Sequence, residues 1–158
     1  MSELASRFAT WEATPPPDLD GDPMWRLPAF RLATFMAIVC RDDESILRRS
    51  ARSLASIEQL AESVDSIGAN IAEGYGRLSG KERARFYEFA MASAREAREW
   101  YRRVSPPLTQ DAAADRRAML SRVIKILAVA IPQERAGSSE RRIRRSQRRS
   151  RKEPPRAT

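Results

Sequence analysis

The chain has 158 residues, of which 42% are hydrophobic and 32% are charged, and its formal net charge is +8. This length suits one domain with a hydrophobic core. The chain contains no histidine and only one cysteine, which excludes Ser-His-Asp catalysis, Cys-His catalysis, closed zinc sites and an internal disulfide. No apolar run approaches the roughly 18 residues of a membrane-spanning helix, and the N-terminus does not resemble a secretory signal, so we expect a cytoplasmic protein.

Residues 1–27 contain the turn-forming runs PPP and DGDP and are predicted to form a flexible N-terminal arm. A first helix is predicted from Pro28, because proline is tolerated in the first turn of a helix. The polar run RDDES is expected to end this helix. Its apolar residues recur at helical spacing: Leu32, Phe35, Met36 and Val39.

The second predicted helix has a longer apolar stripe, with members three and four residues apart. It is expected to end at Gly74 or Gly76, because glycine readily adopts the left-handed conformation that closes a helix. The stripe contains Leu54, Ile57, Leu60, Ala61, Val64, Ile67, Gly68, Ile71 and Tyr75.

A third helix is predicted to begin after Ser79, which can cap the helix together with Glu82 three residues later. Opposite charges three and four residues apart occupy its outer face and are typical of a solvated helix surface. Its stripe contains Phe86, Phe89, Ala90, Ser93, Ala94, Ala97, Trp100, Tyr101 and Val104.

The run SPPLTQD breaks the chain before a fourth helix, predicted from about Asp111. Pro132 is expected to end or kink it. Four amphipathic helices without a convincing strand pattern predict an all-α fold, an antiparallel up-down four-helix bundle over residues 28–136 with flexible N- and C-terminal arms. The stripe of the fourth helix contains Leu120, Val123, Ile124, Leu127 and Ile131.

The positive charge is concentrated at the C-terminus. Residues 138–158 hold nine Arg and Lys against two Glu, a contribution of +7 that leaves +1 for the rest of the chain. We predict that residues 137–158 form a disordered Arg-rich tail, because Ile143 is their one sizeable apolar residue. Clustered arginines favour binding to nucleic-acid phosphates, whereas a membrane surface would also require an apolar face. The predicted contacts are Arg141, Arg142, Arg144, Arg145, Arg148, Arg149, Arg151 and Lys152.

Two groups of basic residues in the body could extend this nucleic-acid-binding surface. They have acidic neighbours, so an ordinary mixed surface is the simpler interpretation. One group precedes the second helix and the other follows it: Arg48, Arg49 and Arg52, and Arg77, Lys81, Arg83 and Arg85.

Asn70 and Glu73 point away from the apolar stripe of the second helix. Three interpretations stay open at this point. The two residues can belong to a solvated face, they can brace the turn that follows, or they can contact another subunit.

The stretch SIGANIAEGYGR, residues 66–77, resembles the signature of the four-helix-bundle family first described from proteins encoded in intervening sequences of 23S ribosomal RNA genes. That signature has N-I-A-E-G, a basic residue, Ser-x-x-Glu and then F-x-x-x-A-x-G-S-x-x-E. The resemblance covers residues 46–104 and departs at Ala92, where the family has glycine. The matching positions are Asn70, Ile71, Ala72, Glu73, Gly74, Arg77, Ser79, Glu82, Phe86, Ala90, Ser93 and Glu96.

The resemblance implies a homo-oligomer, a ring of five bundles, without known catalytic chemistry. It also implies that the motif residues have structural or subunit-interface roles: Asn70, Glu73, Gly74, Ser79, Glu82, Ser93 and Glu96. A related branch is the accessory variability determinant of diversity-generating retroelements, which binds nucleic acid and a reverse transcriptase. That role reaches this chain only by analogy.

The leading hypothesis is therefore a non-enzymatic, oligomeric bundle that binds nucleic acid electrostatically, with RNA expected over DNA. No catalytic residue, metal ligand or cofactor is predicted. The alternative is an oligomeric protein-interaction scaffold or accessory subunit for a nucleic-acid enzyme such as a reverse transcriptase.

Overall fold

The computed structural model of the chain describes residues 2–50, 54–104 and 107–150, with the backbone alone described for residues 50 and 138–150. Every regular element in these ranges is helical, which confirms the predicted all-α class. In chain order the elements are α1 (Glu3–Glu12), two short 3-10 helices (Pro17–Leu19 and Pro23–Arg26), α2 (Pro28–Ser50), α3 (Leu54–Tyr75), α4 (Gly80–Val104) and α5 (Gln110–Ser150).

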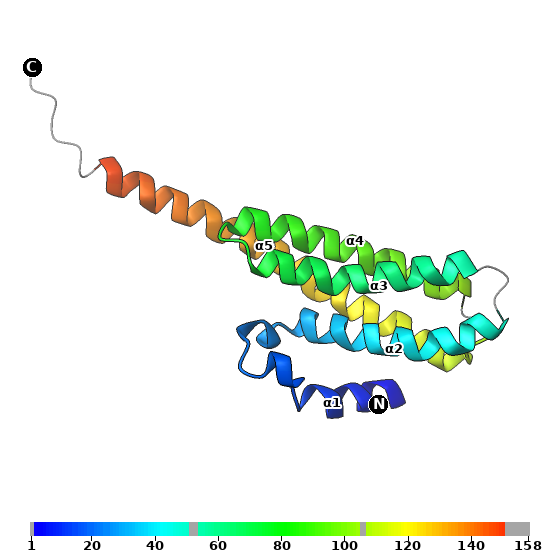
Figure 1. Cartoon of the computed structure of the whole chain (residues 1–158). Coiled ribbons are helices and arrows are strands. Elements are labelled where there is room, and N and C mark those ends of the chain that lie inside the picture. The colour runs from blue at the N-terminus through cyan, green and yellow to red at the C-terminus, as the bar shows by residue number, and fades with distance from the viewer. Residues whose placement is uncertain (1, 51–53, 105–106, 151–158) are drawn as a thin grey trace, which may run out of the picture.

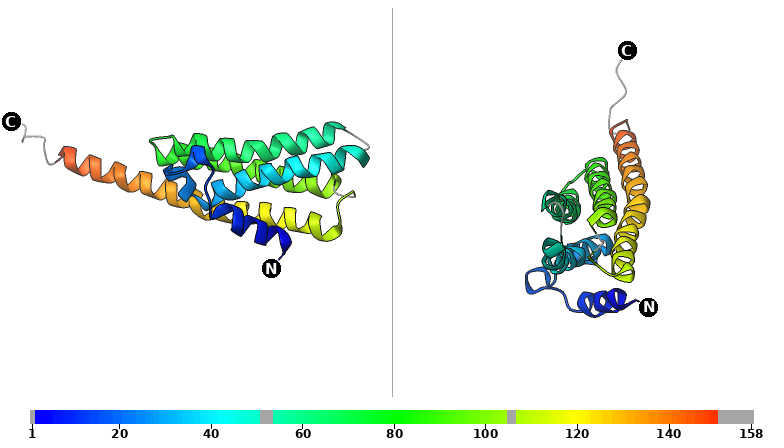
Figure 2. Two further views of the ribbon diagram at one scale, coloured as in Figure 1. Left: turned by 60° about the horizontal axis from the view of Figure 1, so that its bottom comes forward. Right: turned by 90° about the vertical axis from the view of Figure 1, so that its right-hand side faces the viewer.

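The four long helices form a bundle in which successive helices run in opposite directions (Figure 1). α3 packs between α2 and α4, and α5 packs against both α4 and α2, so the four helices surround a common interior. The end-on view in Figure 2 shows this arrangement, with α1 on the outside. α1 contacts α2 and α5.

The predicted apolar stripes supply the core. Burial of each Leu or Ile side chain stabilises the folded state by roughly 1.5–3 kcal/mol relative to leaving it exposed. Three predicted stripe members are instead exposed: Leu54 by 53%, Tyr75 by 40% and Phe89 by 44%. In the described part of the chain, no helix is long and apolar enough to cross a membrane. The largest fully buried side chains include Leu32, Met36, Ile57, Leu60, Ile67, Ile71, Tyr101, Leu120 and Leu127.

The N-terminal segment is structured, which corrects the expectation of a flexible arm over residues 1–27. Leu4 and Phe8 of α1 are buried. The Phe8 ring meets Phe35 of α2 edge to face at 5.3 Å, and Trp11 meets Trp25 at 5.2 Å. A ten-residue helix is marginal alone in water, so this packing stabilises it. The runs PPP and DGDP correctly indicated the connection between α1 and α2, but they gave no information about α1 itself.

α2 continues beyond RDDES to Ser50, so the expectation that this run ends the helix is wrong. The helix continues because residues in and after this run pack inside the bundle. Asp43 is only 1% exposed and is paired inside the bundle, and Leu47 one turn later is buried. The acidic run thus belongs to a helix whose inner face continues through it.

α5 also extends further than expected. Pro132 lies inside the helix, which continues to Ser150, where a disordered tail was predicted from residue 137. Figures 1 and 2 show this part of α5 projecting beyond the ends of α3 and α4. Buried Ile131 and an ion pair at Glu134 hold the chain against α4 on both sides of the proline. Arginine has a high helix propensity, which favours continuation of the helix.

α3 ends at Tyr75 and α4 begins at Gly80, directly after Ser79, as the sequence predicted. The expected left-handed cap is wrong, because Gly21 is the one described residue with a positive φ, 77°. A Cβ atom at Gly74 would lie 2.9 Å from the Cβ of Phe86 and 3.0 Å from the Tyr87 ring. Gly74 is therefore needed for the close approach of α3 and α4 rather than for its backbone freedom.

Candidate nucleic-acid interface

The structure brings two of the three predicted basic groups to one end of the bundle and leaves the third at the other. The turn between α3 and α4 lies beside α5 where α5 leaves the bundle (Figure 1). Arg48 and Arg49 lie near the opposite end, in the last turn of α2, and Arg48 pairs with Glu44 at 3.3 Å. Arg52 falls outside the described residues.

Arg83 joins the turn to α5. Its Nε atom donates to the Glu134 carboxylate at 2.9 Å, and its Nη1 atom donates to the Arg77 carbonyl at 2.7 Å. The Arg83 side chain is 17% exposed. Arg83 therefore connects elements within the chain, and its charge is already compensated by Glu134.

Two neighbouring arginines at this end also form ion pairs, whereas two other cations form none in the described part of the chain. Arg77 pairs with Glu73 across the last turn of α3, and Arg135 pairs with Glu88 of α4. Lys81 and Arg85 are exposed, and no ion pair within the described ranges involves either of them. This end of the bundle thus combines ion-paired arginines with two exposed cations, Lys81 and Arg85, that form no ion pair within the described ranges.

The turn also carries a row of aromatic rings and guanidinium groups. The Arg77 guanidinium lies 4.9 Å from the centroid of the Phe86 ring, and that of Arg85 lies 5.6 Å from the centroid of Phe89. The two rings meet edge to face at 6.0 Å. Such cation–π contacts contribute about 0.5–1 kcal/mol each at exposed sites. They also hold the guanidinium planes against the rings.

The arginine-rich segment belongs to α5 as far as residue 150. Residues 138–150 contain six arginines and one glutamate, so this part of the helix has a net charge of +5. The predicted contacts on the helical backbone are Arg141, Arg142, Arg144, Arg145, Arg148 and Arg149. Arg151 and Lys152 lie outside the described residues.

Three family-motif residues make polar contacts within α3, between α3 and α4, or between α3 and the turn that follows it. The Asn70 amide donates to the Ser66 carbonyl at 2.8 Å and to the Ser66 hydroxyl at 3.0 Å. The Ser93 hydroxyl of α4 donates to the Ser66 hydroxyl at 3.1 Å. Glu73 is exposed and braces the turn through Arg77. Glu73 thus contacts the turn through Arg77, whereas Asn70 is bonded within α3 to Ser66, which in turn contacts α4. A contact of these residues with another subunit stays a prediction.

Two acidic motif positions on α4 are exposed to solvent. Glu82 is exposed, and Glu96 accepts a hydrogen bond from the Trp100 indole at 3.3 Å. Ala92 is also exposed. Its extra methyl group, relative to the glycine of the family signature, therefore does not disturb packing inside the bundle.

A buried polar cluster lies near the other end of the bundle and was not predicted. Arg116 of α5 makes two hydrogen bonds to Asp43 of α2, at 2.9 and 3.1 Å, and the Tyr101 hydroxyl donates to Asp43 at 2.9 Å. Burial raises the pKa of Tyr101 well above its ordinary value. The sequence carries a partial signal, because Asp43 falls between Val39 and Leu47 at helical spacing.

Cys40 lies beside this cluster and is 2% exposed. Desolvation raises the pKa of its thiol to about 12, and the nearby carboxylates of Glu44 and Asp43 act in the same direction. The thiol therefore stays protonated near neutral pH. A buried, protonated thiol is a poor nucleophile and a poor metal ligand.

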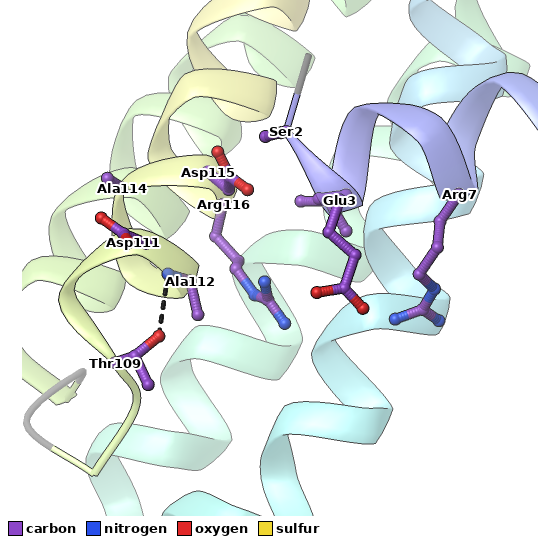
Figure 3. Close-up of a pocket in the computed structure, with 10 residues that line it drawn as sticks. Ser2, Glu3, Arg7, Thr109, Asp111, Ala112, Ala114, Asp115 and Arg116 are labelled. Atoms are coloured by element: carbon purple, nitrogen blue, oxygen red, sulfur yellow. Dashed lines mark hydrogen bonds between the residues drawn. The ribbon is translucent and has the colours of Figure 1, made fainter.

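A cleft of about 660 Å³ opens between the N-termini of α1 and α5 (Figure 3). Its two arginines are engaged, Arg7 by Asp42 at 3.1 Å and Arg116 by Asp43. Glu3 and Asp111 stand in first helical turns, where the helix dipole favours acidic side chains. Ion pairs and helix N-termini thus account for four charged groups of the cleft: Arg7, Arg116, Glu3 and Asp111. In the described part of the protein, no three His, Cys, Asp or Glu side chains are grouped to hold a metal ion.

Comparison with known proteins identifies the family. The family model of the 23S rRNA-intervening sequence protein matches residues 47–129, which is just over half of the chain. A crystal structure of a protein of unknown function from the S23 ribosomal protein family of Bacteroides thetaiotaomicron VPI-5482 has a TM-score of 0.61 and 19% identity, covering 65% of this chain and 97% of that one. At this identity the likeness shows a shared fold alone. No curated protein matches the chain. The chain belongs to the 23S rRNA-intervening sequence protein family.

Proposed function

We propose that the protein is a non-enzymatic, homo-oligomeric, cytoplasmic bundle that binds nucleic acid, with RNA as the expected ligand, through the arginine-rich end of α5. The observation that carries this proposal is the contrast in charge along the helix. The segment beyond the bundle has a net charge of +5, whereas Arg83 and Arg135 at its base are in ion pairs. Net positive charge therefore projects away from the body.

A projecting helix of this kind suits phosphate contacts. Its arginines lie between residues 141 and 149, a length of about 12 Å at 1.5 Å per residue. Each neutralised phosphate releases condensed counterions, so six contacts predict a slope of log K against log salt of about −4 to −5. Contacts to phosphates position a ligand without reading its sequence, so weak sequence selectivity is expected.

The test compares the full-length protein with a full-length variant in which the six arginines are replaced by glutamine. Glutamine has a helix propensity close to that of arginine, so the variant removes charge without favouring unfolding of the segment. In fluorescence anisotropy with labelled structured RNA across a salt series, the variant should bind at least about 100-fold more weakly and with a shallower salt slope.

The matched control replaces Arg48 and Arg49 with glutamine, because both lie at the other end of the bundle. This control should retain the affinity and the salt slope of the unmodified protein. Unchanged binding by the six-glutamine variant, or an equal loss in the control, would refute the role of α5.

The homo-oligomeric state is a separate part of the proposal and is supported by membership of the family. Multi-angle light scattering on the full chain measures it directly. A mass of five chains is the expected result. A monomer at all concentrations would contradict this part and would leave the nucleic-acid experiment unaffected.

The second candidate function is a protein-interaction scaffold for a nucleic-acid enzyme. It is favoured by two exposed apolar side chains at the connection between α2 and α3, Ile46 at 44% and Leu54 at 53%. A partner held by such contacts would remain bound at high salt, because apolar contacts do not depend on counterion release. Retention of a co-purified protein by the native chain but not by an Ile46→Ser/Leu54→Ser variant would favour this function.

A further inference from the structure

The outward face of α4 begins with three exposed residues spaced four apart: Lys81, Arg85 and Phe89. Residues at this spacing lie on one side of a helix, so the three form a stripe about 12 Å long. Phe89 was predicted to be part of the core, yet 44% of it is exposed to solvent. This stripe is called the α4 stripe below.

The α4 stripe carries two cations, Lys81 and Arg85. Within the described ranges neither Lys81 nor Arg85 forms an ion pair, although Arg83 and Arg135 on the adjoining surfaces do. The carboxylate Glu88, next to Phe89 in sequence, is engaged by Arg135. The two cations of the stripe therefore attract an anionic ligand.

The aromatic part of the α4 stripe is held in place by its neighbours. Phe89 meets the Phe86 ring at an interplanar angle of 87°, with the ring centroids 6.0 Å apart, and the Arg85 guanidinium lies 5.6 Å from the Phe89 centroid. The Arg77 guanidinium in turn lies 4.9 Å from the centroid of Phe86. Rings and guanidinium groups that already contact one another lose little conformational entropy when they bind a ligand.

We propose that the α4 stripe binds unpaired nucleotides, with a base stacked on the Phe89 and Arg85 surface and phosphates held by Lys81 and Arg85. An unpaired base exposes a flat face that can stack on an aromatic ring or a guanidinium plane, whereas the bases of a duplex are already stacked on each other. The inference rests on the proposed nucleic-acid function and adds the class of ligand. α5 supplies affinity for phosphates, and the α4 stripe selects single-stranded segments.

The experiment measures binding of the full-length protein to a labelled oligouridine, which stays unpaired, and to a labelled blunt-ended RNA duplex of the same length, which has no unpaired bases. Loss of one stacking contact corresponds to about a 5- to 150-fold weaker affinity. Phe89→Leu should weaken oligouridine binding by a factor in this range and leave duplex binding unchanged. Phe89→Tyr keeps an aromatic ring and should bind oligouridine as the native protein does.

The matched control is Val129→Ala, which changes an apolar residue of α5 that is 58% exposed. It should leave both affinities unchanged. Equal oligouridine affinity in the native protein and in Phe89→Leu would overturn the proposal. If Phe89→Leu lowers the mass of the oligomer in light scattering without changing oligouridine affinity, the residue serves contact between copies, and the proposal is likewise overturned.

Failure of the proposed function has a different signature. In that case the native protein binds neither RNA. If the native protein binds both the duplex and the oligouridine, and Phe89→Leu binds oligouridine as tightly as the native protein, the electrostatic function stands and the α4 stripe alone is refuted.

Discussion

Arginine–carboxylate pairs occur at both ends of the bundle, but in different surroundings. The side chains of Asp43 and Arg116 are 2% and 13% exposed, whereas those of Glu88 and Arg135 are 40% and 55% exposed. A buried charge that loses its partner is costly, whereas exposed pairs contribute about 0–1 kcal/mol because water solvates the separated ions. The first pair therefore specifies how helices meet, and the second leaves a surface that can exchange partners.

The two regions also differ in what they connect. The buried cluster joins α2, α4 and α5 through Asp43, Tyr101 and Arg116. The pairs at the turn join α4 to the base of the projecting helix through Arg83 and Arg135. Stability is thus expected to depend on one end of the bundle, and binding on the other.

The largest effect is expected at Asp43. Asp43→Ala leaves the Arg116 guanidinium and the Tyr101 hydroxyl without their buried acceptor, so the free energy of unfolding should fall by about 3–5 kcal/mol. Urea denaturation followed by circular dichroism measures the loss. The matched control is Asp42→Ala, which removes an exposed pair with Arg7 and should cost no more than about 1 kcal/mol. An equal decrease in the free energy of unfolding of the two variants would show that the buried pair contributes no more than the exposed one.

The next largest effect is expected at Gly74, where α3 and α4 approach closely at the end of the bundle that is proposed to bind nucleic acid. Gly74→Ala places a Cβ atom 2.9 Å from the Phe86 Cβ, so α3 and α4 must separate, and overpacking of this kind costs about 1–3 kcal/mol. Gly68→Ala is the matched control, since its nearest neighbour is the Ala33 Cβ at 3.9 Å. It should stabilise the helix by up to about 1 kcal/mol. Similar unfolding midpoints for the two variants would contradict the close approach at Gly74.

The smallest effect concerns pH and Cys40. The pKa of the buried thiol is raised from 9.0 to about 12. Below pH 9 the thiol is protonated in both states, but above it the unfolded chain releases a proton that the folded chain retains. Stability should therefore fall as the pH rises from 9 towards 12, by about 1.4 kcal/mol per pH unit from this group.

The measurement compares urea unfolding at pH 8 and pH 10 for the native protein and for Cys40→Ala. Tyr101 contributes a decrease in both proteins at higher pH, because burial raises its pKa as well. The native protein should lose about 1 kcal/mol more than the variant between the two pH values. An identical loss would mean that the thiol does not titrate differently in the two states.

Much of the fold could be predicted from local pattern. Residues three and four apart identified the long helices, and the glycines between α3 and α4 marked a real break. The concentration of arginine beyond residue 137 was also readable, because composition does not depend on folding. The signature from Asn70 to Glu96 identified the family before any contact was known.

Other features were decided only by contacts between distant residues. Asp43 meets Arg116 across 73 positions, and Gly74 meets Phe86 across a turn; neither contact leaves a local pattern in the chain. Phe89 belongs to an apolar stripe by spacing, yet it is exposed, because the rotation of α4 places its core face on Ala90, Ala94 and Ala97.

The sequence by itself therefore determined the apolar stripes of the four long helices, the break between α3 and α4, and where charge accumulates, since these follow from local pattern and composition. The tertiary structure alone decided which polar residues are buried in pairs and which aromatic ring stays exposed. It also decided that residues 3–12 pack on the bundle and that α5 continues through Pro132. The physical reason is that burial depends on the distance and rotation between helices, which no single segment encodes.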